Sequence, residues 1–427
     1  MCHSADGEIG TYKVPLKSQK IVGVATSRGS RLYQEDATSV HALQYPVEEI
    51  VRSLQKIDIK WDPAGAGSPY LASQVAYFGI FDGHGGKDIS TYLSTHLHEL
   101  IESVTPSQIQ SVVDWTQGHG GYYRRWRGGA LQRWTSLGDA SPQEGGCMTL
   151  EERLTLAFLQ ADRDIIEGMD KAQRSGSTAT VAMLHSLDSP GEPYWSAKKL
   201  HITVGHCGSA RTWHIHPSPS HPFISLSKLD LSPNSSACWN SMAAANSPLL
   251  PSDTRALLCH RPTGQALALT ERHHADSRIE STRLRRMGAD RLVADSFGES
   301  RWMGAIENTR GIGDAEWKSS GVTAEPEVVT KVVDGDDHSY LILLTDGLTS
   351  LITDQEIVDL ARNAIDPTRA AKTIVHFGED LGAQDNCTCI VVPLAGWGKV
   401  GGRDTTEERR EYRRKQAGML NTRMQRM

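Results

Sequence analysis

Three aspartates follow or flank apolar, strand-like runs of the sequence. They are Asp82 in YFGIFDGHGG, Asp346 in LILLTDGLTS and Asp385 in GAQDNCTCIVV. A single Asp-Gly pair is a common turn, so each aspartate alone is weak evidence for a site. Carboxylates at strand ends can converge on one rim of a sheet sandwich, where they repel each other unless a cation lies among them. Because all-oxygen ligands suit hard cations, this pattern indicates Mg²⁺ or Mn²⁺ rather than zinc.

The residues after Asp82 add a second chemical signal. Gly83, His84, Gly85 and Gly86 follow it directly, and a helical pattern begins at Asp88. A tight strand-to-helix turn explains the glycines, because glycine tolerates dihedrals that other residues avoid. Such a turn requires neither a carboxylate nor an imidazole, so their presence indicates a functional site.

The elements that must position these residues can be read from periodicity and capping signals. Apolar runs predict strands at 21–25, 75–81, 178–184, 200–204, 340–345 and 389–394. Helices are predicted at 88–104, behind the capping boxes at Thr149 and Thr353, from 277 to 288, and after Asp366-Pro367. Strands and helices are interspersed without strict βαβ alternation. We therefore predict an α+β fold, a four-layer αββα sandwich in which helices flank two antiparallel sheets.

The domain organisation follows from where the periodicity is lost. We expect an N-terminal extension at 1–20, one domain at 21–394, and a basic C-terminal tail at 395–427. The domain carries two insertions, at about 105–147, where periodicity is lost, and at about 214–262, which is rich in His, Ser, Pro and Asn. The end of the tail is predicted to be either a charged surface helix or a frayed segment.

Composition excludes several classes of protein. The net charge is −6, which argues against nucleic acid as the main partner, although the Arg-, Gly- and Trp-rich segment 121–134 has a composition found in nucleic-acid-binding proteins. Seven scattered cysteines without a Cys-x-x-Cys pair argue against a disulfide framework or a zinc site. No apolar run approaches the ~20 residues of a membrane span. The start of the chain, with Asp6 and Glu8, predicts an intracellular, cytoplasmic protein, with a mitochondrial or nuclear location left open. We also expect a monomer.

Six motifs in order carry a family resemblance. They are RLYQED (31–36), FDGHGG (81–86), SGSTATV (175–181), TRGIGD (309–314), TDG (345–347) and QDNCT (384–388). Together they resemble the motifs of the metal-dependent protein serine/threonine phosphatases, the protein phosphatase 2C (PPM) family, and they span roughly residues 20–394. The family fold is a β-sandwich flanked by helices. The resemblance implies a phosphatase that acts on phosphoproteins.

The resemblance implies a site for two Mg²⁺ or Mn²⁺ ions. Asp82 would bridge the two ions, and the carbonyl of Gly83 would bind one of them. Asp346 and Asp385 would complete the first metal site. Glu35 would hold the second ion, directly or through water.

Four further residues receive roles from the same resemblance. Arg31 would bind the phosphate, for which its planar guanidinium offers two donors. His84 would be the general acid that protonates the departing serine or threonine oxygen, because its ordinary pKa of ~6.5 lies near working pH. Asp36 would support Glu35, and Asp314 is expected to bind backbone rather than metal. A metal-activated water would attack phosphorus in line, without a covalent enzyme intermediate.

Three positions depart from the family pattern. One is Arg272 in TERHH, where the family usually has an acidic residue, and the other two are serines. Ser209 and Ser350 stand where several members have aspartates that help to bind a third, weaker metal, so we expect two bound metals rather than three. A pseudophosphatase that acts as a binding or scaffold module is the alternative function, and a hydrolase of another phosphoester is a third. The intact set of Arg31, Glu35, Asp82, His84, Asp346 and Asp385 favours the enzyme, because a scaffold does not need these residues together.

Overall fold

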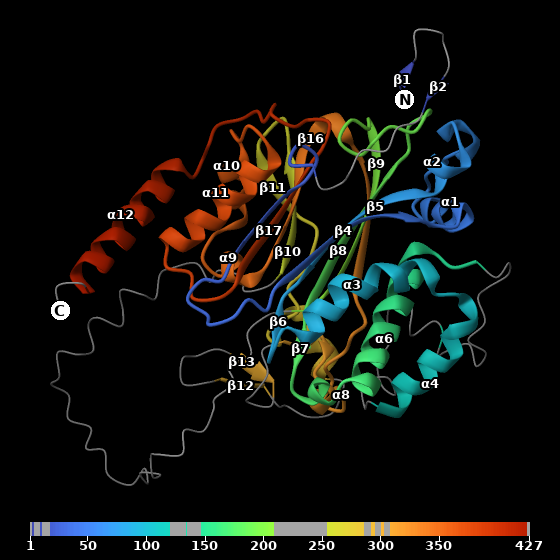
Figure 1. Cartoon of the computed structure of the whole chain (residues 1–427), viewed down its shortest axis with the longest axis horizontal. Helices are drawn as coiled ribbons and strands as arrows, with labels where there is room; N and C mark the ends of the chain where they lie inside the picture. Colours follow the sequence, from blue (N-terminus) through green and yellow to red (C-terminus); the bar gives the residue numbers. More distant parts are fainter. Residues whose placement is uncertain are drawn as a thin grey trace.

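Two five-stranded sheets form the centre of the molecule (Figure 1). The computed structural model describes residues 2–3, 9–10, 18–119, 134, 147–208, 254–285, 292–294, 300–302 and 308–424. One sheet contains, in order, β11 (Gln265–Ala268), β10 (Arg255–His260), β16 (His338–Leu344), β17 (Cys387–Pro393) and β3 (Gly23–Ser27). The other contains β15 (Glu327–Asp334), β9 (Lys199–Cys207), β8 (Ala179–Ser186), β5 (Gln74–Phe81) and β4 (Ala37–Gln44). Neighbouring strands within both sheets are antiparallel.

The central strands are buried on both faces, which explains their almost continuous apolar runs. In β5, Phe78 and Ile80 belong to the core between the two sheets, whereas Tyr77 and Phe81 belong to the core under the helices. The strand β16 shows the same alternation, because Leu341 and Leu343 face the other sheet, and Tyr340, Ile342 and Leu344 pack under helices. Successive side chains of a strand point to opposite faces, so each strand serves two apolar layers at once.

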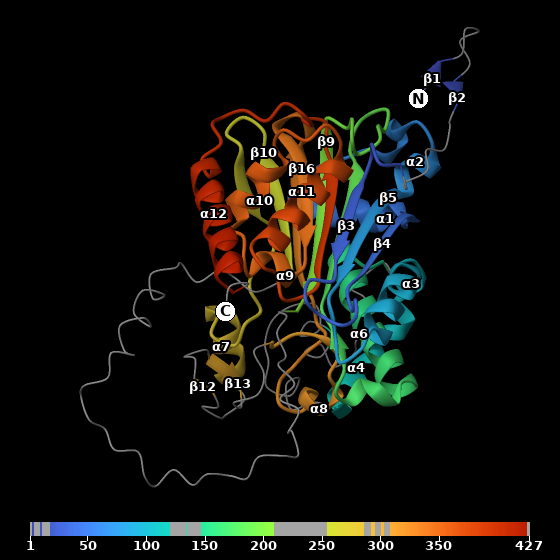
Figure 2. The same cartoon turned by 60° about the vertical axis from the view of Figure 1, so that its left-hand side comes forward.

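Helices cover the outer face of each sheet (Figures 1 and 2). The face of the sheet that contains β5 is covered mainly by α1 (Val47–Gln55), α3 (Asp88–Ser103), α4 (Ile109–His119) and α6 (Leu150–Gly168). The other sheet is covered by α9 (Asp346–Thr349), α10 (Asp354–Ala361) and α11 (Pro367–Asp380). The predicted four-layer αββα sandwich is confirmed.

Short elements complete the described part of the chain. A three-stranded sheet of β14 (Ile312–Gly313), β7 (Gly176–Ser177) and β6 (Gly83–His84) extends from the end of β5. The remaining elements are β1 (Cys2–His3), β2 (Ile9–Gly10), η1 (Pro63–Ala66), α2 (Pro69–Ser73), η2 (Pro106–Gln108), η3 (Asp170–Gln173), α7 (Arg278–Arg285), β12 (Leu292–Ala294), β13 (Ser300–Trp302), α8 (Ala315–Lys318) and η5 (Gly335–Asp337). None of the helices in these described segments is long and apolar enough to cross a bilayer.

Two predictions about the insertions are wrong. Periodicity was expected to be absent from about 105–147, but residues 109–119 form α4. Its side chains Ile109, Val112 and Val113 are buried at the helical spacing i, i+3 and i+4. The second insertion was predicted to end at 262, but β10 begins at Arg255 and is a core strand of its sheet. Most of the remaining insertion sequence lies outside the described residues.

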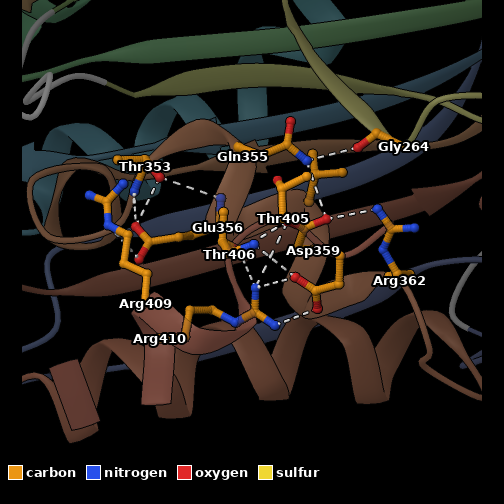
Figure 3. Close-up of polar contacts among 12 residues, drawn as sticks. Gly264, Thr353, Gln355, Glu356, Asp359, Arg362, Thr405, Thr406, Arg409 and Arg410 are labelled. Atoms are coloured by element: carbon orange, nitrogen blue, oxygen red, sulfur yellow. Dashed lines mark hydrogen bonds and ion pairs between the residues drawn. The ribbon is translucent and has the colours of Figure 1, made fainter. Parts of the chain in front are cut away.

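The C-terminal tail forms a docked helix, α12 (Glu407–Met424). Arg413 donates two hydrogen bonds of 2.9 Å to the buried carboxylate of Glu356 on α10, and Arg409 lies 3.5 Å from the same group. Asp359, one turn further along α10, accepts a hydrogen bond from Thr406 at 3.0 Å (Figure 3). Of the two forms predicted for the tail, the structure has the helix. The domain boundary at 394 stays a prediction.

Candidate active site

Asp82 follows the last residue of β5, and its backbone is fully engaged. Its carbonyl accepts hydrogen bonds from the Thr178 amide at 2.9 Å and from the Ser177 hydroxyl at 3.1 Å, while its amide donates to Thr178 Oγ1 at 3.3 Å. Its carboxylate oxygen Oδ2 is buried and has no hydrogen-bond partner. A buried carboxylate oxygen without a donor is costly, so it indicates a ligand at this position.

Asp346 and Asp385 come from neighbouring strands of the opposite sheet. Asp346 is the first residue of α9, just after β16, and its exposed fraction is 2%. Asp385 lies just before β17, which pairs with β16. The end of β16 is tied to the start of β17, because the Thr345 amide donates to the Thr388 carbonyl at 3.1 Å and the Thr388 amide donates to Thr345 Oγ1 at 2.9 Å. These bonds place the two carboxylates at one rim of the sheet.

The charges of Asp346, Asp36 and Asp385 act on the carboxylate of Asp82. Burial raises the pKa of Asp82 well above its usual range, and the negative charges of these neighbouring carboxylates raise it further. Burial also raises the pKa of Asp36 to about 7, although the Thr388 and Thr345 hydroxyls, at 2.6 and 3.0 Å, stabilise its charged form. A cation among them would remove this repulsion.

The loop that carries Glu35 is fixed by one buried amide, Asn386. Its Nδ2 donates to the carbonyls of Arg28 at 3.0 Å and Tyr33 at 3.1 Å, and its Oδ1 accepts from the Glu35 amide at 2.7 Å. The Glu35 carboxylate accepts a hydrogen bond from the Gly86 amide at 2.7 Å. Glu35 is therefore held against the turn that follows Asp82.

Gly83 is required by close packing in the same turn. A Cβ at this position would lie 2.7 Å from the Glu35 carbonyl oxygen and 2.8 Å from Ser90 Oγ. Cβ atoms in proteins essentially never approach other atoms this closely. Any larger residue would push the Glu35 loop away from the helix α3. Gly85, with φ of +74°, adopts the left-handed conformation that favours glycine.

Arg31 lies at the edge of the carboxylate group. Its Nη2 donates to Asp385 Oδ2 at 2.7 Å, and about half of its side chain is exposed. The predicted phosphate-binding cation and a predicted metal ligand are thus an ion pair at the surface of the site.

His84 is paired with Asp314. His84 Nε2 lies 2.8 Å from Asp314 Oδ1, so the Asp314 side chain binds this imidazole. That Asp314 binds backbone rather than metal stays a prediction. Burial opposes the charged imidazolium, yet the charge and hydrogen bond of Asp314 outweigh burial and raise the pKa of His84. Asp314 has φ of +52°, an uncommon conformation for a residue other than glycine, which indicates local strain at the site.

Comparison with known proteins agrees with this arrangement. Residues 253–387 match the family model described as protein phosphatase 2C. Protein phosphatase 2C homolog 4 of Schizosaccharomyces pombe is 29% identical over 401 residues, which cover 92% of this chain and 85% of that protein. The chain is therefore similar to the protein phosphatase 2C family over most of its length. The protein named protein phosphatase 1K, mitochondrial, of Xenopus laevis is 37% identical over 147 residues, or 34% of this chain and 39% of that protein.

A solved structure has a similar fold. The crystal structure of a phosphatase from Toxoplasma gondii superposes with a TM-score of 0.50 at 15% identity, covering 88% of this chain and 96% of that one. At this identity the likeness concerns the sandwich fold alone.

The donors at this candidate site suit a hard cation. The converging groups are carboxylate oxygens, and one of them is the buried, unpartnered Oδ2 of Asp82. Within the described segments, no three His, Cys, Asp or Glu side chains are already arranged as a metal cage. Ser350 donates its amide to the Asp346 carbonyl at 2.8 Å, whereas Ser209 lies outside the described residues, so the predicted absence of a third metal stays a prediction.

Sequence reasoning left two positioning residues of this candidate site unassigned. Asn386 stands in the motif QDNCT, directly before a strand. Its side chain is 3% exposed, and a buried amide must form hydrogen bonds, here with the backbone of the Glu35 loop. Thr388 lies within the apolar run of β17, where a hydroxyl signals a polar partner, here Asp36. Neither could be given a partner from the sequence, because their partners are far away along the chain.

Proposed function

We propose that this chain hydrolyses phosphoserine and phosphothreonine in proteins with Mg²⁺ or Mn²⁺ as cofactor. The observation that supports it most is the convergence of Asp82, Asp346 and Asp385 from two sheets, with the Arg31 cation beside them. Similarity to the family supplies the reaction class.

The residues have separate tasks in this proposal. Asp82, Glu35, Asp346, Asp385 and the Gly83 carbonyl would hold two ions, which when bound lower the pKa of a water so that hydroxide is available near neutral pH. Because no protein nucleophile is involved, we expect no covalent phosphoenzyme.

Arg31 and His84 would act on the phosphate and on the leaving group. Arg31 would exchange its contact with Asp385 for two phosphate oxygens, since a guanidinium binds such a pair in a planar fork. In the protonated imidazole, Nε2 donates to Asp314, so Nδ1 is the donor left for the departing serine or threonine oxygen. The bond from phosphorus to that oxygen breaks as the water oxygen bonds to phosphorus, and the proton from His84 neutralises the leaving alkoxide.

Release of inorganic phosphate from a phosphothreonine peptide tests the proposal. We expect turnover with Mn²⁺ or Mg²⁺ and none in EDTA, with activity restored when the metal is added back. A folded protein that binds the peptide but releases no phosphate under any metal would instead support the scaffold alternative. The monomeric state and the intracellular location stay predictions.

A further inference from the structure

Two large apolar side chains directly follow Arg31 and lie open to solvent. Leu32 is 79% exposed and Tyr33 is 76% exposed. Among the described residues only one other large apolar side chain is as exposed, Ile365, at 87% between α10 and α11. An isolated exposed apolar residue is ordinary, but an adjacent pair next to a phosphate-binding arginine indicates a contact surface.

The backbone under these two side chains is fixed rather than loose. Asn386 Nδ2 holds the Tyr33 carbonyl at 3.1 Å, and Arg28 Nη1 donates to the Leu32 carbonyl at 3.1 Å. The Arg31 amide donates to the Arg28 carbonyl at 3.3 Å. Leu32 and Tyr33 are therefore presented to water from a backbone anchored to the start of β17, so covering them costs little further ordering of the loop.

Leu32 and Tyr33 lie at a distance from Arg31 that the residues next to a bound phosphoresidue can span. Consecutive Cα atoms lie ~3.8 Å apart, so Leu32 and Tyr33 are about one and two such steps from Arg31. An extended peptide advances ~3.3 Å per residue. When Arg31 binds the phosphate, substrate residues one or two positions from the phosphoresidue come within reach of the pair.

We propose that Leu32 and Tyr33 form an apolar platform that binds an aliphatic or aromatic side chain of the substrate polypeptide, one or two residues from the phosphoserine or phosphothreonine. This inference rests on the proposed function and names a substrate preference for the same site. A substrate segment is the occupant because the platform is continuous in the chain with Arg31, whereas a second copy of the protein would have no reason to dock at the phosphate position.

A pair of phosphothreonine peptides of equal length and charge tests the platform. One peptide carries Leu at the two positions on each side of the phosphothreonine, and the other carries Gln there. For the unaltered protein we expect kcat/KM to favour the Leu peptide on the order of tenfold, the size expected when part of an apolar side chain is removed from water. In the double variant Leu32→Gln, Tyr33→Gln this ratio falls toward unity, and in the matched control Ile365→Gln it is retained. The ratio is measured on one preparation, so it does not depend on the active fraction.

The outcomes separate this inference from the function on which it rests. A protein that hydrolyses neither peptide contradicts the proposed function and the platform together. A protein that hydrolyses both peptides equally, or a folded double variant that keeps the preference, contradicts the platform alone. If the double variant does not fold, the unaltered protein and the single variant Tyr33→Gln decide. Light scattering on the same samples adds one check, because a dimer that dissociates in the double variant would assign the surface to a second copy and overturn the proposal.

Discussion

The guanidinium of Arg31 donates a hydrogen bond of 2.7 Å to the carboxylate of Asp385. One residue is the predicted phosphate-binding cation, and the other is a predicted metal ligand from the opposite end of the chain. Arg31 must leave this carboxylate, or share it, when a phosphate arrives. The proposed metal site and the proposed phosphate site therefore meet at this pair.

Replacing Arg31 tests its role in phosphate binding. Arg31→Ala removes a charge-assisted pair of hydrogen bonds, so we expect kcat/KM for a phosphopeptide to fall by about 10- to 100-fold. Arg31→Lys retains the charge but not the planar fork, and should recover only part of the loss. Steady-state kinetics give the comparison, with Arg163→Ala on α6 as the control, since Arg163 pairs with Glu167 on the same helix. Equal kinetics for Arg31→Ala and the control would show that Arg31 does not bind phosphate.

Asp82→Asn tests the metal site. The substitution keeps the shape of the side chain but removes one charge from the proposed bridging ligand. We expect turnover to fall at least ~10²-fold and the dependence on Mg²⁺ or Mn²⁺ to weaken strongly, because the metals supply the attacking hydroxide. Circular dichroism must show that the fold is retained. Near-normal activity in the folded variant would refute the assignment of Asp82.

We expect that the second insertion can be replaced without loss of catalytic activity. Since β10 begins at Arg255, we choose residues 214–250 for replacement by a short Gly/Ser linker, which leaves the strand intact. Loop length adds little to the free energy of closure, and no motif residue lies in this segment. We expect hydrolysis of a small aryl phosphate to stay within a few-fold of the unaltered protein. Loss of that activity in a folded variant would place the segment in the active site.

A buried ion-pair network makes the stability of the protein depend on pH. Glu280 is fully buried and accepts hydrogen bonds from Arg283 at 2.8 Å and from Arg310 at 2.7 Å. Burial opposes its charge, but the two arginines outweigh burial and lower the pKa of Glu280 well below its usual range. A carboxylate whose pKa is lower in the folded state stabilises the fold above the unfolded pKa of ~4.3, and this stabilisation is lost as the pH falls through the folded pKa.

Glu280→Gln should remove that dependence. We expect a loss of roughly 3 kcal/mol in the free energy of unfolding near pH 7, because both arginines lose a charged partner. The difference in the free energy of unfolding between the variant and the unaltered protein should become smaller in acid. Urea unfolding between pH 3 and pH 7 measures it. Glu316→Gln is the control, since Glu316 pairs with Arg174 at the surface and should cost under ~1 kcal/mol. A pH-independent difference would contradict the assigned pKa direction.

The tail helix should be released by a single substitution. Arg413→Ala removes both hydrogen bonds to the Glu356 carboxylate and leaves that group with fewer charged partners. We expect amide hydrogen exchange of residues 407–418 to accelerate by about tenfold, an effect of ~1.4 kcal/mol on local opening. Lys415→Ala is the matched control, because Lys415 is largely exposed and lies 4.0 Å from Glu411. Equal exchange in the two variants would mean that α12 is held by other contacts.

The limits of the strands could be predicted from the sequence better than the contacts within the candidate site. The predicted strand limits lie within three residues of those observed, and for β5 and β16 the reason is an apolar run on both faces that stops at a polar residue, Asp82 or Thr345. The capping boxes at Thr149 and Thr353 also begin the expected helices. By contrast, β4 (ATSVHALQ) is only partly buried, so its pattern gave too weak a signal to be predicted.

The polar contacts of the site could not be predicted, because each joins residues far apart in the chain. His84 and Asp314 are separated by 230 positions, and Asn386 and Glu35 by 351. Periodicity and capping rules act over a few residues only, so they place each residue on its element but do not name its partner. The family resemblance supplied the candidate roles, and the structure supplied the pairs.

The proposed metal ligands come from two different sheets. The distances between their carboxylates therefore depend on how the hydrophobic interior holds the sheets apart. Asp82 follows β5 in one sheet, whereas Asp346 and Asp385 adjoin β16 and β17 in the other. Between these sheets lie fully buried side chains such as Phe78 and Leu343. Their sizes fix how far apart the two sheets stand, and thereby where one carboxylate stands relative to the others. The thickness of this apolar layer between the sheets therefore sets the spacing of the charged groups at its edge.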